Sequence, residues 1–246
     1  LQRRILRFGF AEIPLHDAAT GFRPGLSIRD NALPHVGKPL VVNVDIASFF
    51  PSTRYELVLR ACRKLLGGKI SPAAARLAAD LCCFGGALPT GAPTSPAIAN
   101  IVLTPLDKAL GKVCARRGIS YTRYADDLTF SGGSDAKKVL PFVHRLLDQL
   151  GYRLDGKKTN LFRRGRRQVV TGLVVNDKPN LPRRLRRKLR AAVDQRARGG
   201  QAKWHGKFIG DAKLLGLIAH LNLVQPEEAR RHKQRLEAVR TKKALS

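Results

Sequence analysis

Three aspartates have the residue type and setting best suited to chemistry: Asp45, Asp126 and Asp127. Asp45 lies at the end of a run of apolar residues, where an unpaired carboxylate is costly and tends to take up a proton. Asp126 and Asp127 are adjacent, so two like charges are crowded together. A divalent cation shared by the three carboxylates would relieve both problems. A pair of Mg²⁺ ions, which Mn²⁺ can replace, is suited to in-line phosphoryl transfer.

Each of these signals alone has an ordinary explanation. An Asp-Asp pair is usually a solvated turn, because Asp side chains favour turns through local hydrogen bonds. An Asp at the end of a strand is usually a helix cap or a partner in an ion pair. The combination favours chemistry: Asp45 is followed by Phe49 and Phe50, then by a Gly/Pro loop, then by an apolar hairpin whose tip carries Asp126 and Asp127.

The elements that position the carboxylates can be predicted from the hydrophobic period and from Gly and Pro. Residues 40–46 (LVVNVDI) predict a strand that is buried on both faces and ends at its aspartate. Residues 119–124 and 128–131 flank YADD and predict the two strands of a hairpin, with Asp126 and Asp127 in the turn.

The rest of the chain is predicted to be mostly helical, with loops where Gly and Pro gather. The predicted helices span residues 1–10, 54–66, 72–83, 97–112 and 136–150, and the predicted loops span residues 21–39 and 85–96. Residues 169–175 predict a further short strand, and the chain from residue 179 onward is predicted to be helical and basic. This order indicates an α+β fold with an appended helical segment.

The charge of the chain favours a polyanionic partner. The chain has 46 Lys and Arg against 18 Asp and Glu, a formal net charge of +28, and 43% hydrophobic residues, which is enough for a folded core. This excludes an acidic disordered tail. Between residues 157 and 190, thirteen basic residues accompany a single acid, Asp177. A solvated helix would mix the signs, so this segment predicts a track for a nucleic-acid backbone, with salt-sensitive affinity.

Cysteine spacing and hydropathy indicate the cellular environment in which the protein is expected to work. Cys62, Cys82, Cys83 and Cys114 form no CxxC pair, and the histidines show no zinc spacing. We therefore expect small core cysteines in a reduced, cytoplasmic protein. No apolar stretch is long enough to span a bilayer and no signal sequence is visible, so no membrane association is expected. The chain contains no Met, which indicates a start inside a longer open reading frame.

Three segments resemble the successive palm motifs of reverse transcriptases: DIASFF (45–50), LPTGAPTSPAIAN (88–100) and YADD (124–127). Two more, NAxxH within residues 27–35 and VTG within residues 166–176, resemble retron-type bacterial reverse transcriptases more than group II intron enzymes. The resemblance covers nearly the whole chain and is least specific after residue 180. It implies a right-hand polymerase fold with an antiparallel-sheet palm, partial fingers and a helical thumb.

The resemblance also implies a division of the chain. The implied parts are partial fingers (1–39), the palm with the first catalytic strand (40–55), helices of the fingers and palm (56–86), the palm with the catalytic hairpin (87–178) and a basic helical thumb (179–246). Members of the family usually carry a further N-terminal fingers segment with basic residues. We therefore expect a fragment with weak or no activity alone.

By the same resemblance, Asp45, Asp126, Asp127 and the backbone carbonyl of Ile46 hold two Mg²⁺ ions. Lys158 matches the position proposed in the family as the general acid for the leaving pyrophosphate. The alternative role of Lys158 is a simple contact with phosphate, since many basic residues surround it in the sequence.

The nucleotide site implied by the family comprises Ile46, Ser48, Phe49, Phe50, Thr90 and Gly91. Phe50 would lie under the sugar and exclude a 2′-hydroxyl, whereas Phe49 is also explained as core. Gly91 would let the backbone approach the nucleotide, or be an ordinary turn glycine. The family often has Gln at the position of Thr90, and the shorter hydroxyl cannot reach the sugar in the same way.

Contacts with nucleic acid are implied for a wider set of residues. They are Asn31, His35, Tyr124, Arg166, Arg167, Val170, Thr171, Gly172, Arg183, Arg184, Arg186, Arg187 and Lys188. Asn31 and His35 match the retron pattern and are expected either to scaffold a loop or to contact RNA. The VTG strand is expected to lie near the primer.

The implied activity is RNA-directed DNA synthesis, which adds nucleotides from deoxynucleoside triphosphates to a primer 3′-hydroxyl on a structured RNA template. The retron pattern further implies RNA-linked or multicopy single-stranded DNA, a role in antiphage defence and an effector protein encoded nearby. Two alternatives stay open: a group II intron or other defence-associated reverse transcriptase, and an RNA-binding scaffold without chemistry. The three retained carboxylates speak against the scaffold, since a pure binder would gain affinity for phosphate by losing them.

Overall fold

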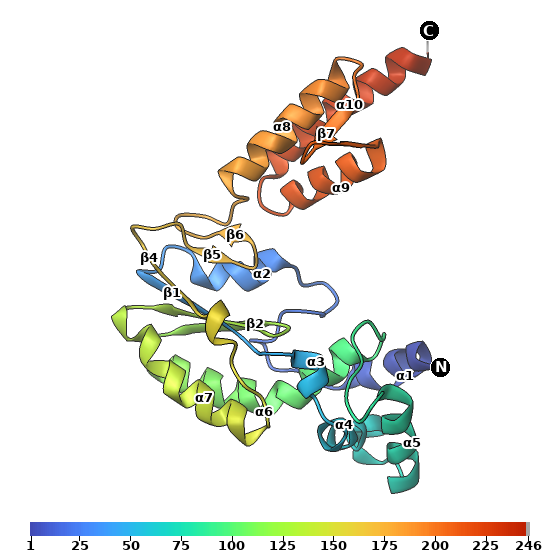
Figure 1. Cartoon of the computed structure of the whole chain (residues 1–246), viewed down its shortest axis with the longest axis vertical. Helices are drawn as coiled ribbons and strands as arrows, with labels where there is room; N and C mark the ends of the chain where they lie inside the picture. Colours follow the sequence, from blue (N-terminus) through green and yellow to red (C-terminus); the bar gives the residue numbers. More distant parts are fainter. Residues whose placement is uncertain (245–246) are drawn as a thin grey trace.

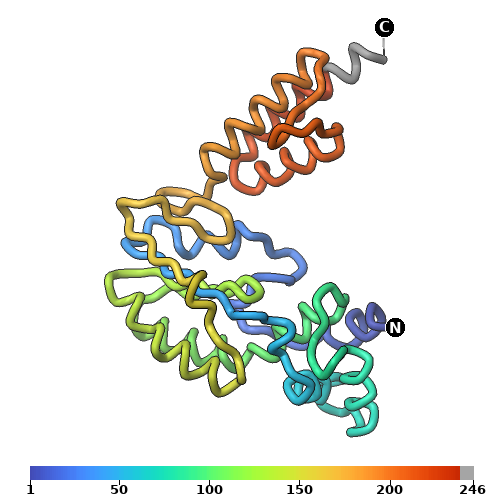
Figure 2. Tube along the Cα trace, in the orientation of Figure 1, coloured from blue at the N-terminus to red at the C-terminus, as the bar shows by residue number. Residues whose placement is uncertain are grey.

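The computed structural model describes residues 1–244 and shows an elongated molecule in three parts (Figure 1). Short helices lie at one end, a sheet covered by helices lies in the middle, and a helical bundle lies at the other end. Figure 2 follows the chain from the N-terminal helices through the sheet to the far end of the bundle. No helix within residues 1–244 combines the length and the apolar character needed to cross a bilayer.

The middle part is built on a four-stranded antiparallel sheet in the order β2-β3-β1-β4. The strands are β1 (Leu40–Asp45), β2 (Ser120–Tyr124), β3 (Asp127–Gly132) and β4 (Asn160–Arg163). The predicted central strand and the predicted hairpin are confirmed, with one difference: Asp127 is the first residue of β3 rather than part of the turn. The sequence prediction lacks β4, because this strand is short and mostly exposed and so carries no hydrophobic pattern.

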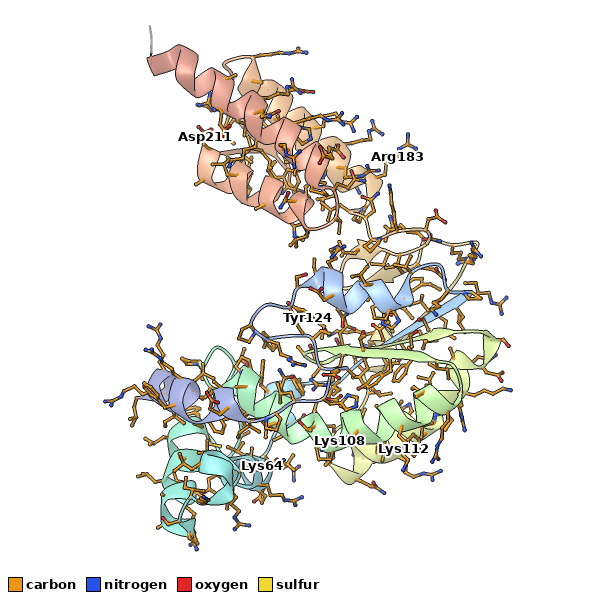
Figure 3. All side chains as sticks on the ribbon, turned by 180° about the vertical axis from the view of Figure 1, so that it is seen from behind. Lys64, Lys108, Lys112, Tyr124, Arg183 and Asp211 are labelled. Atoms are coloured by element: carbon orange, nitrogen blue, oxygen red, sulfur yellow. The ribbon has the colours of Figure 1, made fainter. Side chains whose placement is uncertain are left out.

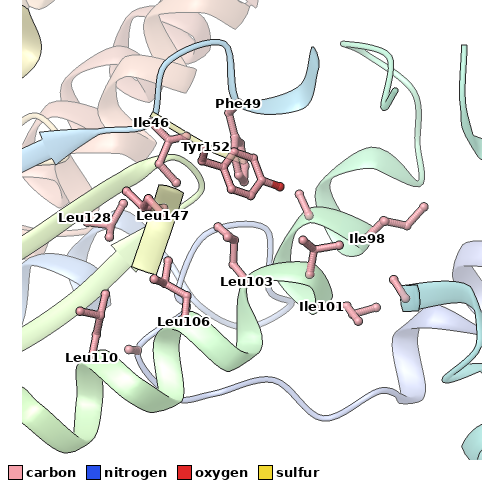
Figure 4. Close-up of a cluster of buried hydrophobic side chains, with 14 of the residues drawn as sticks. Ile46, Phe49, Ile98, Ile101, Leu103, Leu106, Leu110, Leu128, Leu147 and Tyr152 are labelled. Carbon is pink, nitrogen blue, oxygen red and sulfur yellow. The ribbon is translucent and has the colours of Figure 1, made fainter. Parts of the chain in front are cut away.

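The two faces of the sheet contact different cores, because successive strand side chains alternate. On one face, Ile46 and Leu128 pack with α6 (Ser95–Arg116) and with Leu147 of α7 (Leu140–Gln149) in the main core (Figure 4). On the other face, Val41 joins a second core. Each of these fully buried aliphatic side chains contributes about 1.5–3 kcal/mol through burial. The carboxylate end of the sheet is therefore held on a rigid base.

The second core joins the sheet to the C-terminal part. It contains residues of α2 (Ile28–Ala32), of the hairpin β5 (Val169–Val170) and β6 (Leu173–Val174), and of the bundle. The bundle consists of α8 (Arg183–Ala197), β7 (Ala202–Trp204), β8 (Lys207–Ile209), α9 (Asp211–Asn222) and α10 (Pro226–Ala244). The prediction of a helical C-terminal part is confirmed. The sequence does not predict the hairpin β7–β8, because each of its strands has only three residues and so carries no clear hydrophobic pattern.

Two predictions on this side of the sheet are wrong. Residues 169–175 form a two-stranded hairpin rather than one strand, because Thr171 and Gly172 have φ angles of 45° and 82° and turn the chain. The predicted loop 21–39 contains α2, whose N-terminus is stabilised by a capping box between Ser27 and Asp30. The Gly and Pro residues on either side of this short helix led to the prediction of a loop.

The N-terminal part contains α1 (Gln2–Phe8), α3 (Phe49–Ser52), α4 (Tyr55–Cys62) and α5 (Pro72–Cys82). The predicted helix 54–66 ends early, at Cys62. Beyond it, Leu66 and Gly67 have positive φ angles, which an α-helix does not contain. The 3-10 helices are Phe10–Glu12, Leu33–His35, Leu65–Gly68, Ser134–Val139 and Gly156–Lys158. All four cysteines are free, and all but the half-buried Cys83 are fully buried, as expected for small core residues.

Candidate active site

The three aspartates meet at one end of the sheet. Asp45, the last residue of β1, is the register partner of Asp127, the first residue of β3. Side chains directly opposite each other in an antiparallel pair lie on the same face, and the preceding apolar pair faces the main core, so these two aspartates lie on the opposite face. Asp126 is in the turn, and its carbonyl accepts a hydrogen bond from the Ile46 amide at 3.0 Å.

The carboxylates of this cluster repel one another. Burial is the main cause that raises the pKa of Asp127 to about 6, and the charges of Asp45 and Asp126 raise it further. Burial also raises the pKa of Asp126, and the charge of Asp45 contributes. Lys158 acts in the opposite direction on both groups. A cation among the carboxylates would be favoured, since an opposite charge stabilises their ionised forms.

Lys158 places a positive charge at this cluster. Its Nζ donates a hydrogen bond to Asp45 Oδ1 at 2.8 Å, with the lysine side chain 58% exposed and the aspartate side chain 14% exposed. The lysine ends the 3-10 turn Gly156–Lys158, and Asp155, which begins this turn, donates its amide to the Asp45 carbonyl at 2.8 Å. The role of Lys158 as a proton donor stays a prediction.

The donor chemistry of the cluster fits a hard divalent cation. Mg²⁺ prefers carboxylate and carbonyl oxygens, and three carboxylates and the backbone that follows Asp45 lie at one end of the sheet. Within the described part of the chain, no three His, Cys, Asp or Glu side chains already converge as a metal-binding group. Here Asp45 Oδ1 accepts a hydrogen bond from Lys158, so a cation bound by Asp45 would either share this carboxylate with the ammonium or displace it.

The segment after β1 carries residues predicted to contact a nucleotide. Ser48 is exposed, has a φ angle of 47° and begins the short helix α3. Phe49 is buried, and its ring centroid lies 5.2 Å from that of Phe50 and 6.0 Å from that of Tyr152. Phe49 is therefore a core residue, whereas Phe50 is half-buried and keeps a surface toward solvent.

The Gly/Pro loop before α6 is attached to the same region. The Leu88 amide donates to the Thr53 carbonyl at 3.1 Å, so the loop begins beside the end of α3. Thr90 and Gly91 follow and are exposed. Gly91 has a φ angle of 89°, and a Cβ added there would meet no atom within 4 Å. The backbone conformation, rather than crowding within the protein, explains this glycine.

Comparison with known proteins decides the family. Residues 2–210 match the family described as "Reverse transcriptase (RNA-dependent DNA polymerase)". The chain belongs to this family. The carboxylates on neighbouring β1 and β3 are thus the aspartates of the DIASFF and YADD segments that carried the resemblance, and the α+β fold with an antiparallel sheet agrees with a right-hand polymerase.

The curated relatives are retron reverse transcriptases. The Mx65 enzyme of Myxococcus xanthus is 38% identical over 94% of this chain and 57% of its own length, and the Mx162 enzyme of the same organism is 37% identical over 93% and 53%. The Ec86 enzyme of Escherichia coli is 32% identical over 78% and 60%. The chain therefore spans somewhat more than half the length of these relatives.

A solved structure of Candida albicans telomerase with a telomeric RNA fragment has a TM-score of 0.49 at 8% identity, over 60% of this chain and 32% of that one, and is too distant to support a conclusion.

The two segments with the retron pattern contact each other. Asn31 and His35 have no exposed surface. His35 bonds through Nδ1 to Ser131 Oγ at 2.7 Å and through Nε2 to Thr122 Oγ1 at 2.8 Å. Asn31 Nδ2 donates to the Thr171 Oγ1 of the VTG segment at 3.5 Å. Of the two expected roles, the structure supports scaffolding. The expected RNA contact through these two side chains is wrong for this conformation, because no atom of either reaches the surface.

Burial also limits the VTG segment. The Val170 side chain is fully buried, so a contact of this side chain with nucleic acid is not available. Thr171 is half-buried and Gly172 exposed at the hairpin tip, where a strand of nucleic acid can reach them. Tyr124, at the end of β2 (Figure 3), is half-buried. Its ring centroid lies 6.3 Å from that of Phe22.

The predicted basic residues lie on two surfaces. Arg166 and Arg167 are exposed in the turn before β5, and α8 begins at Arg183 where the bundle joins the sheet (Figure 3). Within the described residues, Arg183, Arg184 and Arg187 are exposed without an ion pair, whereas Arg186 pairs with Glu228. Lys188 is half-buried, with its Nζ 3.2 Å from His205 Nδ1. The accessible positive charge of α8 is therefore concentrated in its first turns.

Sequence reasoning missed one polar pair next to the carboxylates. Arg123 of β2 and Asp107 of α6 form an ion pair with no exposed side-chain surface. The one available signal was the position of Arg123, because strand alternation places it on the core-facing side together with Tyr121.

Proposed function

We propose that this protein catalyses RNA-directed DNA synthesis, adding deoxynucleotides to a primer 3′-hydroxyl. The observation that carries the proposal is the direct opposition of Asp45 and Asp127 on paired strands, with Asp126 beside them and mutual repulsion that a cation would relieve. Membership in the reverse transcriptase family supports this reaction class for the cluster.

The chemistry follows from the residues at the sheet end. Asp45, Asp126, Asp127 and the Ile46 carbonyl would hold two Mg²⁺ ions, with Mn²⁺ as a substitute. When bound, the metal supplies positive charge that lowers the pKa of the primer hydroxyl and neutralises the triphosphate and the leaving pyrophosphate. Lys158, 2.8 Å from Asp45, would donate the proton that the pyrophosphate takes up.

Other residues would select and hold the substrates. Phe50, half-buried beside Phe49, would exclude a 2′-hydroxyl, and Ser48, Thr90 and Gly91 would contact the nucleotide. The exposed arginines of α8 would bind the phosphates of a primer-template duplex. In this proposal, residues 1–39 are partial fingers, residues 56–86 are helices of the fingers and palm, residues 40–55 and 87–178 are palm, and residues 179–246 are thumb.

We further propose the retron type, on the basis of the curated relatives and of the contact between the NAxxH and VTG segments. The template would be a structured non-coding RNA, and the product RNA-linked or multicopy single-stranded DNA. The setting would be antiphage defence in the cytoplasm, with an effector protein encoded nearby. The group II intron alternative lacks support from these relatives.

The test measures deoxynucleotide incorporation on a primed RNA template with Mg²⁺, in the full-length protein that the gene encodes. The double variant Asp126→Asn/Asp127→Asn should lose incorporation by a factor of about 1,000 or more while retaining RNA binding. The matched control is Asp135→Asn/Asp177→Asn, which removes two exposed carboxylates and should keep full activity. Equal, negligible incorporation by wild type and double variant, with tight RNA binding by both, would support the scaffold alternative instead.

A further inference from the structure

A buried ion pair lies directly beneath the turn that carries the aspartates. Arg123 donates from Nε to Asp107 Oδ1 at 2.9 Å and from Nη2 to Asp107 Oδ2 at 2.6 Å. Neither side chain has any exposed surface. The Tyr121 hydroxyl donates to the same carboxylate at 2.7 Å. This two-pronged geometry fixes the plane of the guanidinium relative to α6.

The remaining nitrogen of the guanidinium reaches the turn. Arg123 Nη1 donates to the Ala125 carbonyl at 2.9 Å and to Asn100 Oδ1 at 2.9 Å. The Ala125 carbonyl belongs to the peptide group that joins Ala125 to Asp126. A hydrogen bond from a fixed donor therefore sets the orientation of this peptide, and with it the direction in which the Asp126 side chain leaves the backbone.

The turn needs such a restraint. Ala125 has a φ angle of 58°, in the left-handed region that residues with a Cβ rarely adopt. The two residues after it are like-charged, and Asp45 adds a third negative charge at the same place. Without a fixed partner for the Ala125 carbonyl, both the backbone preference and the repulsion would favour other conformations of the turn.

The same network holds the turn from a second side. Asn100 Nδ2 donates to the Gly21 carbonyl at 2.8 Å, and the Thr20 amide donates to the Arg123 carbonyl at 2.8 Å. A Cβ added at Gly21 would lie 2.5 Å from the Ala125 nitrogen, so only glycine lets the two backbones come this close. The turn is thus enclosed between α6 and the segment around residues 20–21.

Charge alone does not explain this arrangement. Asp107 neutralises Arg123, so the pair supplies little net field at the carboxylates. A buried ion pair is also weak evidence for stability, since apolar residues of similar volume often serve as well. What an apolar pair could not provide is a directed donor to the Ala125 carbonyl.

We propose that Arg123, held in place by Asp107, is a positioning residue for the carboxylate turn: its Nη1 fixes the Ala125–Asp126 peptide and so keeps Asp126 and Asp127 in the arrangement that binds the divalent cation. This inference rests on the proposed function and deepens it. It assigns to a residue with no access to substrate an influence on metal affinity and on the rate of the chemical step, exerted through the Ala125–Asp126 peptide.

The main test compares Arg123→Lys with Tyr121→Phe. Lysine keeps the charge and can pair with Asp107, but its single nitrogen lacks the rigid fork through which Arg123 bonds Asp107 with two nitrogens and directs the third at the Ala125 carbonyl. Phenylalanine removes a hydrogen bond from the same carboxylate without touching the turn.

The measurements are Mn²⁺ affinity by calorimetry and steady-state incorporation, both well below the unfolding temperature of each variant. We expect Arg123→Lys to weaken Mn²⁺ binding about tenfold and to lower kcat about 10- to 100-fold with KM for the nucleotide little changed. Tyr121→Phe should change neither by more than about twofold.

A second variant keeps the test decisive if lysine is not tolerated. Arg123→Met/Asp107→Leu replaces the ion pair by apolar residues of similar volume and should fold, yet it should show the same losses in Mn²⁺ affinity and kcat. Wild-type affinity and kcat in either variant would overturn the inference and leave the proposed function standing, as would unfolding of both variants while Tyr121→Phe folds. A wild-type protein that neither binds Mn²⁺ nor incorporates nucleotides would overturn the proposed function and this inference together.

Discussion

Lys158 and Asp45 are joined by a hydrogen bond of 2.8 Å, although 113 positions separate them in the chain. The bond links the turn after α7 to the end of β1 and places an exposed ammonium against the carboxylate cluster. Lys158 is therefore within reach of whatever Asp45 binds. The adjacent Lys157 is also exposed, and its backbone amide donates to Asp155 Oδ1 at 3.0 Å.

The pair Lys157 and Lys158 allows a matched test of the proton donor. Lys158→Gln should lower kcat about 100-fold, because a positioned general acid contributes a factor of about 100 or more. Lys157→Gln removes the same charge one residue away and should leave kcat nearly unchanged. Single-turnover incorporation at saturating nucleotide measures both. If the two variants differ only in KM or in salt sensitivity, Lys158 is a phosphate contact and not an acid.

Phe50 is expected to set sugar selectivity. Its ring is half-buried against Phe49 and is the bulky surface next to the sheet end. Phe50→Ala should raise the ratio of ribonucleotide to deoxynucleotide kcat/KM by about tenfold or more, since removal of bulk relieves the clash with a 2′-hydroxyl. Phe49→Leu, which alters the buried ring, should lower the melting temperature and leave the ratio unchanged. An unchanged ratio in Phe50→Ala would assign the selectivity elsewhere.

The elements that the sequence predicts well are those with a clear burial pattern. β1 is a nearly continuous apolar run because both of its faces are covered. In the hairpin around YADD, β3 carries an apolar residue at every second position, Leu128 and Phe130, and both face the main core. β4 has no such pattern because its residues are mostly exposed. α2 is only five residues long, so its capping box, Ser27 with Asp30, is the strongest signal it has.

The residues of the site also divide into those that the sequence could predict and those that it could not. The three aspartates could be predicted because motif order and residue type are both readable in the sequence. Asn31 and His35 could not be placed, since polar residues suggest a surface and burial with full hydrogen bonding leaves no trace in composition. The pair of Arg123 with Asp107 depends on the packing of β2 against α6, and no local rule selects one aspartate on a long helix as the partner.

The exposed arginines of α8 should control the salt dependence of RNA binding. Arg183, Arg184 and Arg187 face solvent at the start of the bundle. Replacing all three by Gln should reduce the slope of log affinity against log salt by about 2 to 3, because each phosphate contact contributes about 0.7 to 0.9 to the slope. Arg196→Gln is the control, since Arg196 is already paired with Asp211 at 2.7 Å, and its slope should stay near wild type. Fluorescence anisotropy with a labelled primer-template at several salt concentrations measures both. Equal slopes for the triple variant and wild type would contradict the assignment of α8 as the track.

His35 should make the fold sensitive to acid. Burial lowers its pKa from 6.5 to about 3, and the nearby charge of Lys38 acts in the same direction. The unfolded chain therefore binds a proton between pH 6.5 and pH 3 that the folded chain excludes, so the contribution of His35 to stability is complete above pH 6.5 and is lost as the pH falls through this window. Between pH 7 and pH 5 the free energy of unfolding should fall by about 2 kcal/mol through this residue.

His35→Gln lacks the titrating group, so the stability difference between wild type and this variant should shrink by that amount over the same range, as measured by urea unfolding at each pH. His144→Gln, which changes an exposed histidine on α7, is the matched control. A constant difference for His35→Gln would show that this histidine does not titrate on unfolding.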